Sequence, residues 1–375
     1  MKNEFCAPWL PSSAPDWASL LGRAGSAERP VLVPGIAGAS VLVTGAGGFI
    51  GAEMVRVLAA SSAAKIVLLD VCGQHLFEIS SEMAQRGQAS RCVATLGSVC
   101  DTVLLDSVFA EHRPEIVVHA AALKHVPLME SNPIAAVATN ALGTWNVAQA
   151  AERHGARYML LVSTDKAAAP CSIMGAAKRV AELVILASGR RMRRAALRLV
   201  NVIGSPGSVG PLFLEQMARG GPVTVTHPDA RRWFFTLQQT MRLLGEAMTE
   251  QLSGLLVPEP GEPMRIVELA GRMIAASGRN VPIVFTEPRP GEKIDEVLLG
   301  EDEQLVGQPS DPLRLVMSPA GECLESRIPR LEAAVARRDG TEMLRMVSEL
   351  VPGYRPGAVV RAAIQRHAEA AAPLP

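Results

Sequence analysis

The stretch VLVTGAGGFIG, Val41 to Gly51, decides the fold of this chain. Its first residues form an apolar run typical of a buried β-strand, and a glycine-rich turn follows at once. Gly45 permits the tight turn, Gly48 lets the backbone approach a pyrophosphate, and Gly51 lets the next helix pack closely on the sheet. The amino end of that helix then faces the phosphate charge. The stretch therefore predicts a dinucleotide-binding loop.

Further apolar runs alternate with helical segments along the first half of the chain. The runs expected to form buried strands are Lys65–Asp70, Glu115–Ala120, Arg157–Ser163 and Ala195–Val200, and Ala52–Ala60 has helical character. Buried strands separated by helices imply a parallel sheet that is covered on both faces. We predict an α/β fold, a Rossmann-type doubly wound parallel sheet with a smaller C-terminal substrate-binding lobe.

The chain divides by composition. Glycine and proline become frequent after Asn201, which indicates a loop-rich lobe. The predicted parts are an irregular lead at 1–40, a dinucleotide-binding domain at 41–205 on which 236–258 pack back, a mainly substrate-binding lobe at 206–356, and a tail at 357–375. Helices are expected at Ile266–Ser277, within Leu331–Leu350 and at Gly357–Ala372.

Composition narrows the classes of function. The chain has 375 residues, 48% of them hydrophobic, with 37 Lys+Arg against 37 Asp+Glu, so no net charge draws it to nucleic acid or to an anionic membrane. It has no apolar run of membrane-spanning length, and Met1–Leu10 does not resemble a signal peptide. The six cysteines form no C-x-x-C pair and no zinc spacing. We expect a soluble cytoplasmic protein without a metal.

Asp70 indicates which dinucleotide binds. It ends the apolar run after the glycine loop, where a carboxylate accepts hydrogen bonds from the adenosine ribose and repels a 2′-phosphate. NAD is therefore favoured over NADP.

The glycine spacing, the sequence His119-Ala-Ala-Ala and Asn140 with Gly143 resemble the extended short-chain dehydrogenase/reductases. One departure is Ser98, where that group usually has an Asp that contacts adenine. The resemblance implies further cofactor contacts at Phe49, Ile50, Ser98, Val99, Ala120, Ala121, Ala122, Asn140 and Lys178.

The segment LVSTDKAAAPCSIMGAAKRVAE, Leu161 to Glu182, carries the chemistry. Short-chain dehydrogenases usually place a Tyr four residues before a Lys. The Tyr acts as the acid/base, and the Lys lowers the pKa of the Tyr. Lys178 is present here, but Met174 stands where the Tyr is expected. A thioether cannot carry a proton, so the ordinary alcohol–ketone relay lacks its carrier.

Thr164-Asp165-Lys166 offers a different chemistry at the end of a buried strand. Dehydration of a sugar at C5 and C6 needs a base for the C5 proton beside an acid for the departing C6 hydroxyl. Oxidation at C4 acidifies the C5 proton, and the hydride then returns to C6. An adjacent acid and base suit this reaction.

Several motifs in order resemble the CapD-like polysaccharide biosynthesis family of UDP-N-acetylglucosamine-type 4,6-dehydratases. They are GAGGFIG, AALKHVPLMESNP, STDKAAAP, MGAAKR, NVIGSPGSVGPLF, GGPVTVTHPDARRWFFT and RPGEK, within about Asp16 to Pro356. The form with Met in place of Tyr is typical of long members with membrane helices ahead of the catalytic domain, and this chain resembles that domain.

The resemblance implies a role for each residue of the segment. Asp165 protonates the C6 hydroxyl, and Lys166 removes the C5 proton, for which it must be neutral through a pKa lowered by Lys178 and the nicotinamide. Thr164 bonds the C4 hydroxyl, Lys178 also holds the nicotinamide ribose, and Met174 lines the pocket. The acceptor of the C4 hydroxyl proton stays open between a water and Asp165.

The expected partner is a nucleotide-activated sugar, with a UDP-sugar favoured, and the protein is expected to be a homo-oligomer. The residues assigned to substrate are Lys124, Asn201, Arg232, Arg289 and Glu292. Two alternatives stay open, a nucleotide-sugar epimerase on the same fold and a non-catalytic nucleotide-binding protein. The missing Tyr weighs against the first, and the intact Asp165, Lys166 and Lys178 weigh against the second.

Overall fold

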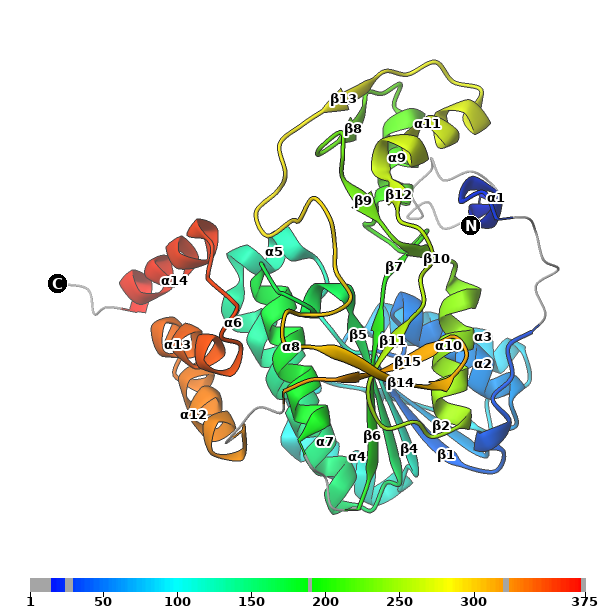
Figure 1. The fold of residues 1–375 in the computed structure, drawn as a ribbon. Coiled ribbons are helices and arrows are strands. Elements are labelled where there is room, and N and C mark those ends of the chain that lie inside the picture. Colours follow the sequence, from blue (N-terminus) through cyan, green and yellow to red (C-terminus); the bar gives the residue numbers. More distant parts are fainter. Residues whose placement is uncertain (1–14, 24–29, 188–190, 320–323, 372–375) are drawn as a thin grey trace.

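The computed structural model describes residues 15–23, 30–187, 191–319 and 324–371. Its centre is a nine-stranded sheet in the order β3-β2-β1-β4-β5-β6-β11-β15-β14 (Figure 1). The strands are β1 Ser40–Thr44, β2 Lys65–Asp70, β3 Cys92–Leu96, β4 Ile116–His119, β5 Tyr158–Thr164, β6 Arg193–Leu199, β11 Gly254–Pro258, β14 Gln304–Ser310 and β15 Leu313–Met317. The strands from β3 to β11 pair in parallel, and β15 and β14 continue the sheet antiparallel.

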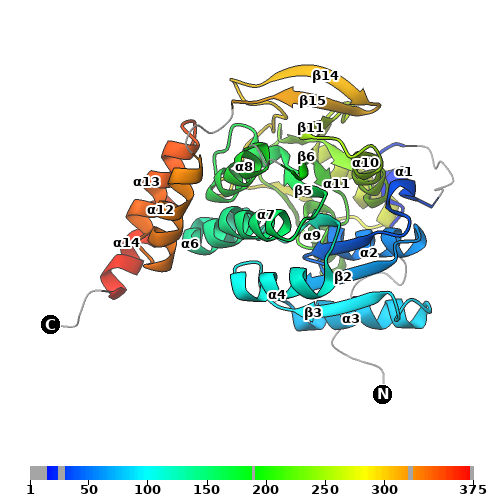
Figure 2. The ribbon, with the colours of Figure 1, turned by 90° about the horizontal axis from the view of Figure 1, so that it is seen from below.

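Helices cover both faces of this sheet, which confirms the predicted doubly wound fold (Figure 2). One apolar core lies between the sheet and α2, α3 and α10, and a second lies between the sheet and α4, α7 and α8. Their bounds are α2 Phe49–Ala60, α3 Gly73–Gln85, α4 Thr102–His112, α7 Gly143–Arg153, α8 Ile173–Leu186 and α10 Leu237–Thr249. Alternating βα connections put the carboxyl ends of β1, β4, β5 and β6 at one edge of the sheet, where ligands of such folds bind.

A smaller lobe stands above that edge (Figure 1). It has its own core, built mainly from α9 and α11 with short strands. The elements of this region are α1 Trp17–Leu20, β7 Asn201–Val202, α9 Val209–Ala218, β8 Val223–Val225, β9 Arg231–Arg232, β10 Phe234–Phe235, β12 Met264–Arg265, α11 Ile266–Ser277 and β13 Ile283–Phe285. The segment 286–303 runs from β13 in the lobe down to β14 in the main sheet (Figure 1).

The C-terminal part differs from the predicted division. Residues 304–317 were expected in the lobe, but they form the antiparallel extension of the main sheet. The helices α13 Gly340–Leu350 and α14 Ala358–Ala371 pack on α6 Pro133–Ala136, α14 also packs on α5 Val126–Ser131, and α12 Leu324–Ala336 packs on α13 (Figure 1). None of the helices in the described ranges is long and apolar enough to cross a membrane. The stretch Met1–Leu10 lies outside those ranges.

Candidate active site

The glycine loop between β1 and α2 is as tight as its sequence predicts. Gly45 has a φ of +66°, and a Cβ on Gly51 would lie only 2.0 Å from the Gly45 carbonyl oxygen. A Cβ on Gly45 would lie 2.7 Å from the backbone nitrogen of Ala121. Side chains are excluded at both positions, so the turn can bring the amino end of α2 close to a phosphate.

Asp70 lies at the carboxyl end of β2, beside this loop. Its Oδ2 accepts a hydrogen bond from the Gly47 N–H at 2.8 Å, and its Oδ1 accepts one from the Cys72 N–H at 2.8 Å. Each carboxylate oxygen keeps a second lone pair, which can accept a ribose hydroxyl. The cradle of glycines and this carboxylate therefore fit an adenine dinucleotide.

Thr164, Asp165 and Lys166 form a connected group where β5 ends. Asp165 is fully buried, and its Oδ1 accepts hydrogen bonds from Thr164 Oγ1 and from Lys166 Nζ, both at 2.9 Å. Its Oδ2 is buried and has no hydrogen-bond partner within the described part of the chain. Lys166 Nζ also lies 3.4 Å from the Asn201 Oδ1. An acid, a hydroxyl and an amine are thus in direct contact.

The charge state of Lys166 differs from the expected one. Burial by itself lowers its pKa, but the carboxylates of Asp165 and Glu296 outweigh burial and raise the pKa above the ordinary lysine value. Lys178, which was expected to lower it, is not the group that determines this pKa. The protein groups alone hold Lys166 as an ammonium ion.

Met174 and Lys178 are one turn apart on α8, and both are buried. Lys178 Nζ donates a hydrogen bond to the Val162 carbonyl at 2.7 Å. Burial lowers the Lys178 pKa to about 8, although Glu182 opposes the shift. Met174 lines the same cavity as Lys178, and its thioether brings no proton carrier to it.

One cavity of about 470 Å³ brings most of the predicted residues together. The predicted residues that line it are Gly45, Gly48, Phe49, Ile50, Gly51, Ala120, Ala122, Lys124, Thr164, Lys166, Met174, Lys178 and Asn201. The cavity thus joins the glycine loop to Thr164 and Lys166, whereas the predicted acid Asp165 and the predicted cofactor residue Asp70 are not among its lining residues. Lys124 lies on the side toward the lobe, where its Nζ donates to the Pro206 carbonyl at 2.9 Å.

Four predicted cofactor residues, Asn140, Ser98, Val99 and Ala121, are not among the residues that line this cavity. Asn140 is buried and exchanges two hydrogen bonds with the Leu123 backbone, at 2.8 and 2.9 Å, so it fixes the loop after β4. Ser98 Oγ accepts a hydrogen bond from the Cys100 N–H at 3.1 Å, and Val99 is buried. Ala121 backs the turn through a 3.3 Å hydrogen bond from its N–H to Thr44 Oγ1.

Three predicted substrate residues lie outside the cavity lining. Arg232 donates to the carbonyl oxygens of Lys293 and Ile294, each at 2.6 Å, so its guanidinium fastens the descending segment. Arg289 is half-exposed, and its backbone N–H donates to Glu292 Oε2 at 3.1 Å. Their assignment to substrate stays a prediction.

Two buried features were missed from the sequence. Glu296 lies 3.4 Å from Lys166 Nζ, and its only sequence signal is its position just after RPGEK. Arg198, the last residue but one of β6, is fully buried and pairs with Glu182 at 2.7 Å. Glu182 in turn accepts a 2.6 Å hydrogen bond from Ser163 Oγ, next to Thr164, so this network fixes β5 and α8 relative to each other.

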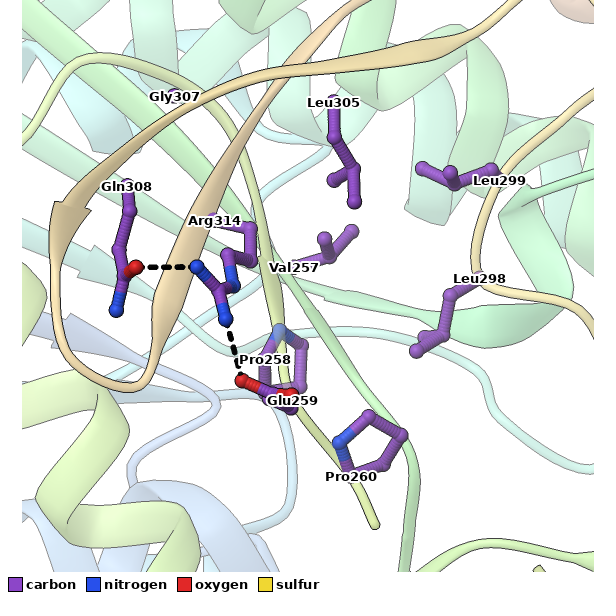
Figure 3. A pocket seen from close by; sticks show the side chains of 10 residues that line it. All are labelled: Val257, Pro258, Glu259, Pro260, Leu298, Leu299, Leu305, Gly307, Gln308 and Arg314. Carbon is purple, nitrogen blue, oxygen red and sulfur yellow. Dashed lines mark hydrogen bonds and ion pairs between the residues drawn. The ribbon is translucent and has the colours of Figure 1, made fainter. Parts of the chain in front are cut away.

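A second hollow, of about 560 Å³, lies between β11 and the β14–β15 hairpin (Figure 3). Its lining is mostly aliphatic, with Leu298, Leu299 and Leu305 opposite an ion pair of Arg314 with Glu259 at 2.6 Å. This lining has no counterpart of Thr164 and Lys166, which line the first cavity and bond the Asp165 carboxylate, so the first cavity is the candidate active site.

Comparison with known proteins identifies the family. A family model described as a polysaccharide biosynthesis protein matches residues 41–316. The probable polysaccharide biosynthesis protein EpsC of Bacillus subtilis (strain 168) is 43% identical over 72% of this chain and 46% of EpsC. The capsular polysaccharide biosynthesis protein CapD of Staphylococcus aureus is 41% identical over 70% of this chain and 45% of CapD. The chain therefore spans about half the length of these curated relatives.

Other relatives are named after two different reactions, 4,6-dehydration and 4-epimerisation. A UDP-N-acetylglucosamine 4,6-dehydratase (inverting) of Campylobacter jejuni is 28% identical over 71% of this chain and 79% of its own length. A UDP-glucose 4-epimerase of Rickettsia canadensis is 34% identical, but over 52% of this chain and 58% of its own length. Among solved structures, Pen from Bacillus thuringiensis is 27% identical with a TM-score of 0.66, over 72% of this chain and 84% of that one.

The match over residues 41–316 contains all seven motifs of the predicted resemblance, from GAGGFIG to RPGEK. The predicted family is thereby confirmed: this chain belongs to the family of polysaccharide biosynthesis proteins, on an extended short-chain dehydrogenase/reductase fold.

Proposed function

We propose that this chain is an NAD-dependent 4,6-dehydratase of a nucleotide-activated sugar, with a UDP-N-acetylglucosamine-like substrate. One observation carries the proposal. Thr164 and Lys166 line the cavity and both hydrogen-bond the buried carboxylate of Asp165, while Met174 stands where a simple oxidoreductase would have a proton-carrying Tyr. The name of the Campylobacter jejuni relative supports the reaction and the sugar.

The cofactor proposal rests on the glycine cradle and on Asp70. NAD, when bound, supplies the acceptor for the hydride from C4 and the donor of the hydride to C6. The carboxylate of Asp70 favours NAD because it would repel the 2′-phosphate of NADP. Lys178 faces the cavity and is the residue proposed to hold the nicotinamide ribose.

The C4 hydroxyl proton has a path through the protein. Thr164 Oγ1 donates to Asp165 Oδ1 at 2.9 Å, so it can accept a hydrogen bond from the C4 hydroxyl and pass a proton on. Asp165 becomes a carboxylic acid in this step. It then protonates the C6 hydroxyl, which leaves as water. The proton released at C4 is thus consumed at C6.

Lys166 handles the C5 proton. Its Nζ takes that proton and later returns one to C5 when the hydride reaches C6. Protons therefore balance over the cycle, and the product is a 4-keto-6-deoxy sugar nucleotide. Lys124 and Asn201 line the cavity and are proposed to contact the sugar nucleotide.

The alternative of a 4-epimerase is favoured by relatives that carry that name, among them the UDP-glucose 4-epimerase of Rickettsia canadensis. An isotope experiment separates the two reactions. With substrate carrying deuterium at C4, the dehydratase should deliver the label to C6 of the product without accumulation of NADH. Label that returns to C4 of an epimer would support the epimerase, and label that stays in unchanged substrate would support a non-catalytic protein.

A further inference from the structure

Glu296 is a buried acid that the proton path above does not use. It lies on the segment between β13 and β14, with a side chain only 3% exposed. Its Oε1 lies 3.4 Å from Lys166 Nζ and 3.9 Å from Arg232 Nε. Its Oε2 is buried, lies 3.7 Å from Lys293 Nζ and has no hydrogen-bond partner among the residues that the structure describes. A proton on this carboxyl would break no existing hydrogen bond.

The segment that carries Glu296 is fastened on both sides. Arg232 donates to the carbonyl oxygens just before Glu296, at 2.6 Å each. Arg198, buried in β6, donates to the Leu298 carbonyl just after it at 2.7 Å. These bonds fix the Glu296 carboxylate against Lys166, with little freedom to turn toward solvent.

This arrangement addresses a requirement of the proposed reaction. Lys166 must be neutral to remove the C5 proton, yet two carboxylates flank its ammonium group. Asp165 is occupied with the proton that travels from C4 to C6. Glu296 is the second carboxylate in contact, and it has no other step to perform.

We propose that Glu296 accepts the ammonium proton of Lys166 and thereby makes Lys166 the neutral base at C5. In this transfer a Lys166 N–H bond breaks and a Glu296 O–H bond forms. Lys166 then takes the C5 proton, returns a proton to C5 after the hydride reaches C6, and recovers its own from Glu296. The inference rests on the proposed dehydratase function, and Glu296 acts through Lys166 as a positioning residue.

The proton transfer from Lys166 to Glu296 takes place among a few charged and titratable side chains. Asp165, Glu296 and Arg232 face Lys166, while Arg232, Lys293 and the thiol of Cys171 face Glu296. Burial raises the pKa of the Cys171 thiol, so it stays neutral. Exchange of one proton between Lys166 and Glu296 leaves the net charge of this group unchanged, which limits its electrostatic cost.

The kinetic test uses Glu296→Gln, Glu296→Asp and the control Asp295→Asn, an exposed carboxylate next in the chain. We expect Glu296→Gln to lower kcat at neutral pH by about 10²-fold, the usual worth of a positioned proton acceptor. The loss should shrink as the pH rises and solvent deprotonates Lys166, while KM changes little. Glu296→Asp should recover part of the neutral-pH rate, and Asp295→Asn should match wild type. A loss that is equal at every pH, or no loss, overturns the inference.

A second arm does not depend on activity. Because Glu296 raises the pKa of Lys166, acetic anhydride should label Lys166 of Glu296→Gln at lower pH than in wild type, as followed by peptide mass spectrometry. An unchanged labelling profile overturns the contact between the two groups. If labelling shifts but wild type dehydrates no sugar nucleotide, the proposed function fails; if wild type dehydrates and Glu296→Gln keeps its rate, only the role of Glu296 fails.

Discussion

Lys178 gives a quantitative test of how the site is built. Burial lowers its pKa from 10.5 to about 8. Since one pKa unit corresponds to about 1.4 kcal/mol, the buried charge costs the folded state on the order of 3 kcal/mol at neutral pH. Below the folded-state pKa, Lys178 is protonated in both the folded and the unfolded state, and the full cost of the buried charge applies. Above the unfolded-state pKa, Lys178 is neutral in both states and this cost vanishes. The unfolded chain binds more protons between the two values, so the free energy of unfolding rises with pH there.

The test compares wild type with Lys178→Met in urea denaturation, without cofactor. Relative to Lys178→Met, the free energy of unfolding of wild type should rise by about 3 kcal/mol between about pH 7 and pH 10.5. Met174→Leu, one turn away on the same helix, is the control, because it removes no titratable group and its difference should not vary with pH. A wild type–Lys178→Met difference that stays constant over this range would refute the reasoning.

Three further predictions concern the cavity. Gly51→Ala should abolish NAD binding in calorimetry, because its Cβ would meet a carbonyl oxygen at 2.0 Å; unchanged affinity would contradict the tight turn. Asp70→Ala should weaken NAD binding and relax selectivity toward NADP, and an unaltered preference would count against its role. Asp165→Asn and Lys166→Met should each lower turnover by roughly 10²–10⁴-fold. Met174→Ala should lower turnover much less, because the Met174 side chain carries no proton. Equal losses of turnover for all three variants would point to a structural effect.

The sheet could be predicted at β1, β2, β4, β5 and β6, whose sequences contain buried apolar runs, whereas the buried strand β11 was not predicted. The apolar run Lys65–Asp70 and the amphipathic helix Ile266–Ser277 have the predicted bounds, because their patterns depend only on local sequence. The edge strands were missed. β14 is exposed along most of its length and contains Gly and Pro, so no apolar pattern distinguishes it from a loop. Only its pairing with β15 makes it a strand.

The site was predicted where a motif fixes the local geometry. The glycine loop and Thr164-Asp165-Lys166 each belong to a single turn, and the structure brings the loop, Thr164 and Lys166 to one cavity, with Asp165 buried in contact with the latter two. Glu296 contacts Lys166 from a segment distant in sequence, and no spacing rule reports such a pair. The pKa shift of Lys166 was predicted in the wrong direction, because the carboxylates of Asp165, its neighbour in the sequence, and of Glu296 together outweigh burial.

The most direct test of the central claim is the mass of the product. Purified protein is incubated with UDP-N-acetylglucosamine and NAD, and the sugar nucleotide is examined by mass spectrometry with Asp165→Asn as the inactive control. We predict a product lighter by one water, formed by wild type and almost absent with the variant. A product of unchanged mass with altered stereochemistry would contradict the dehydratase account.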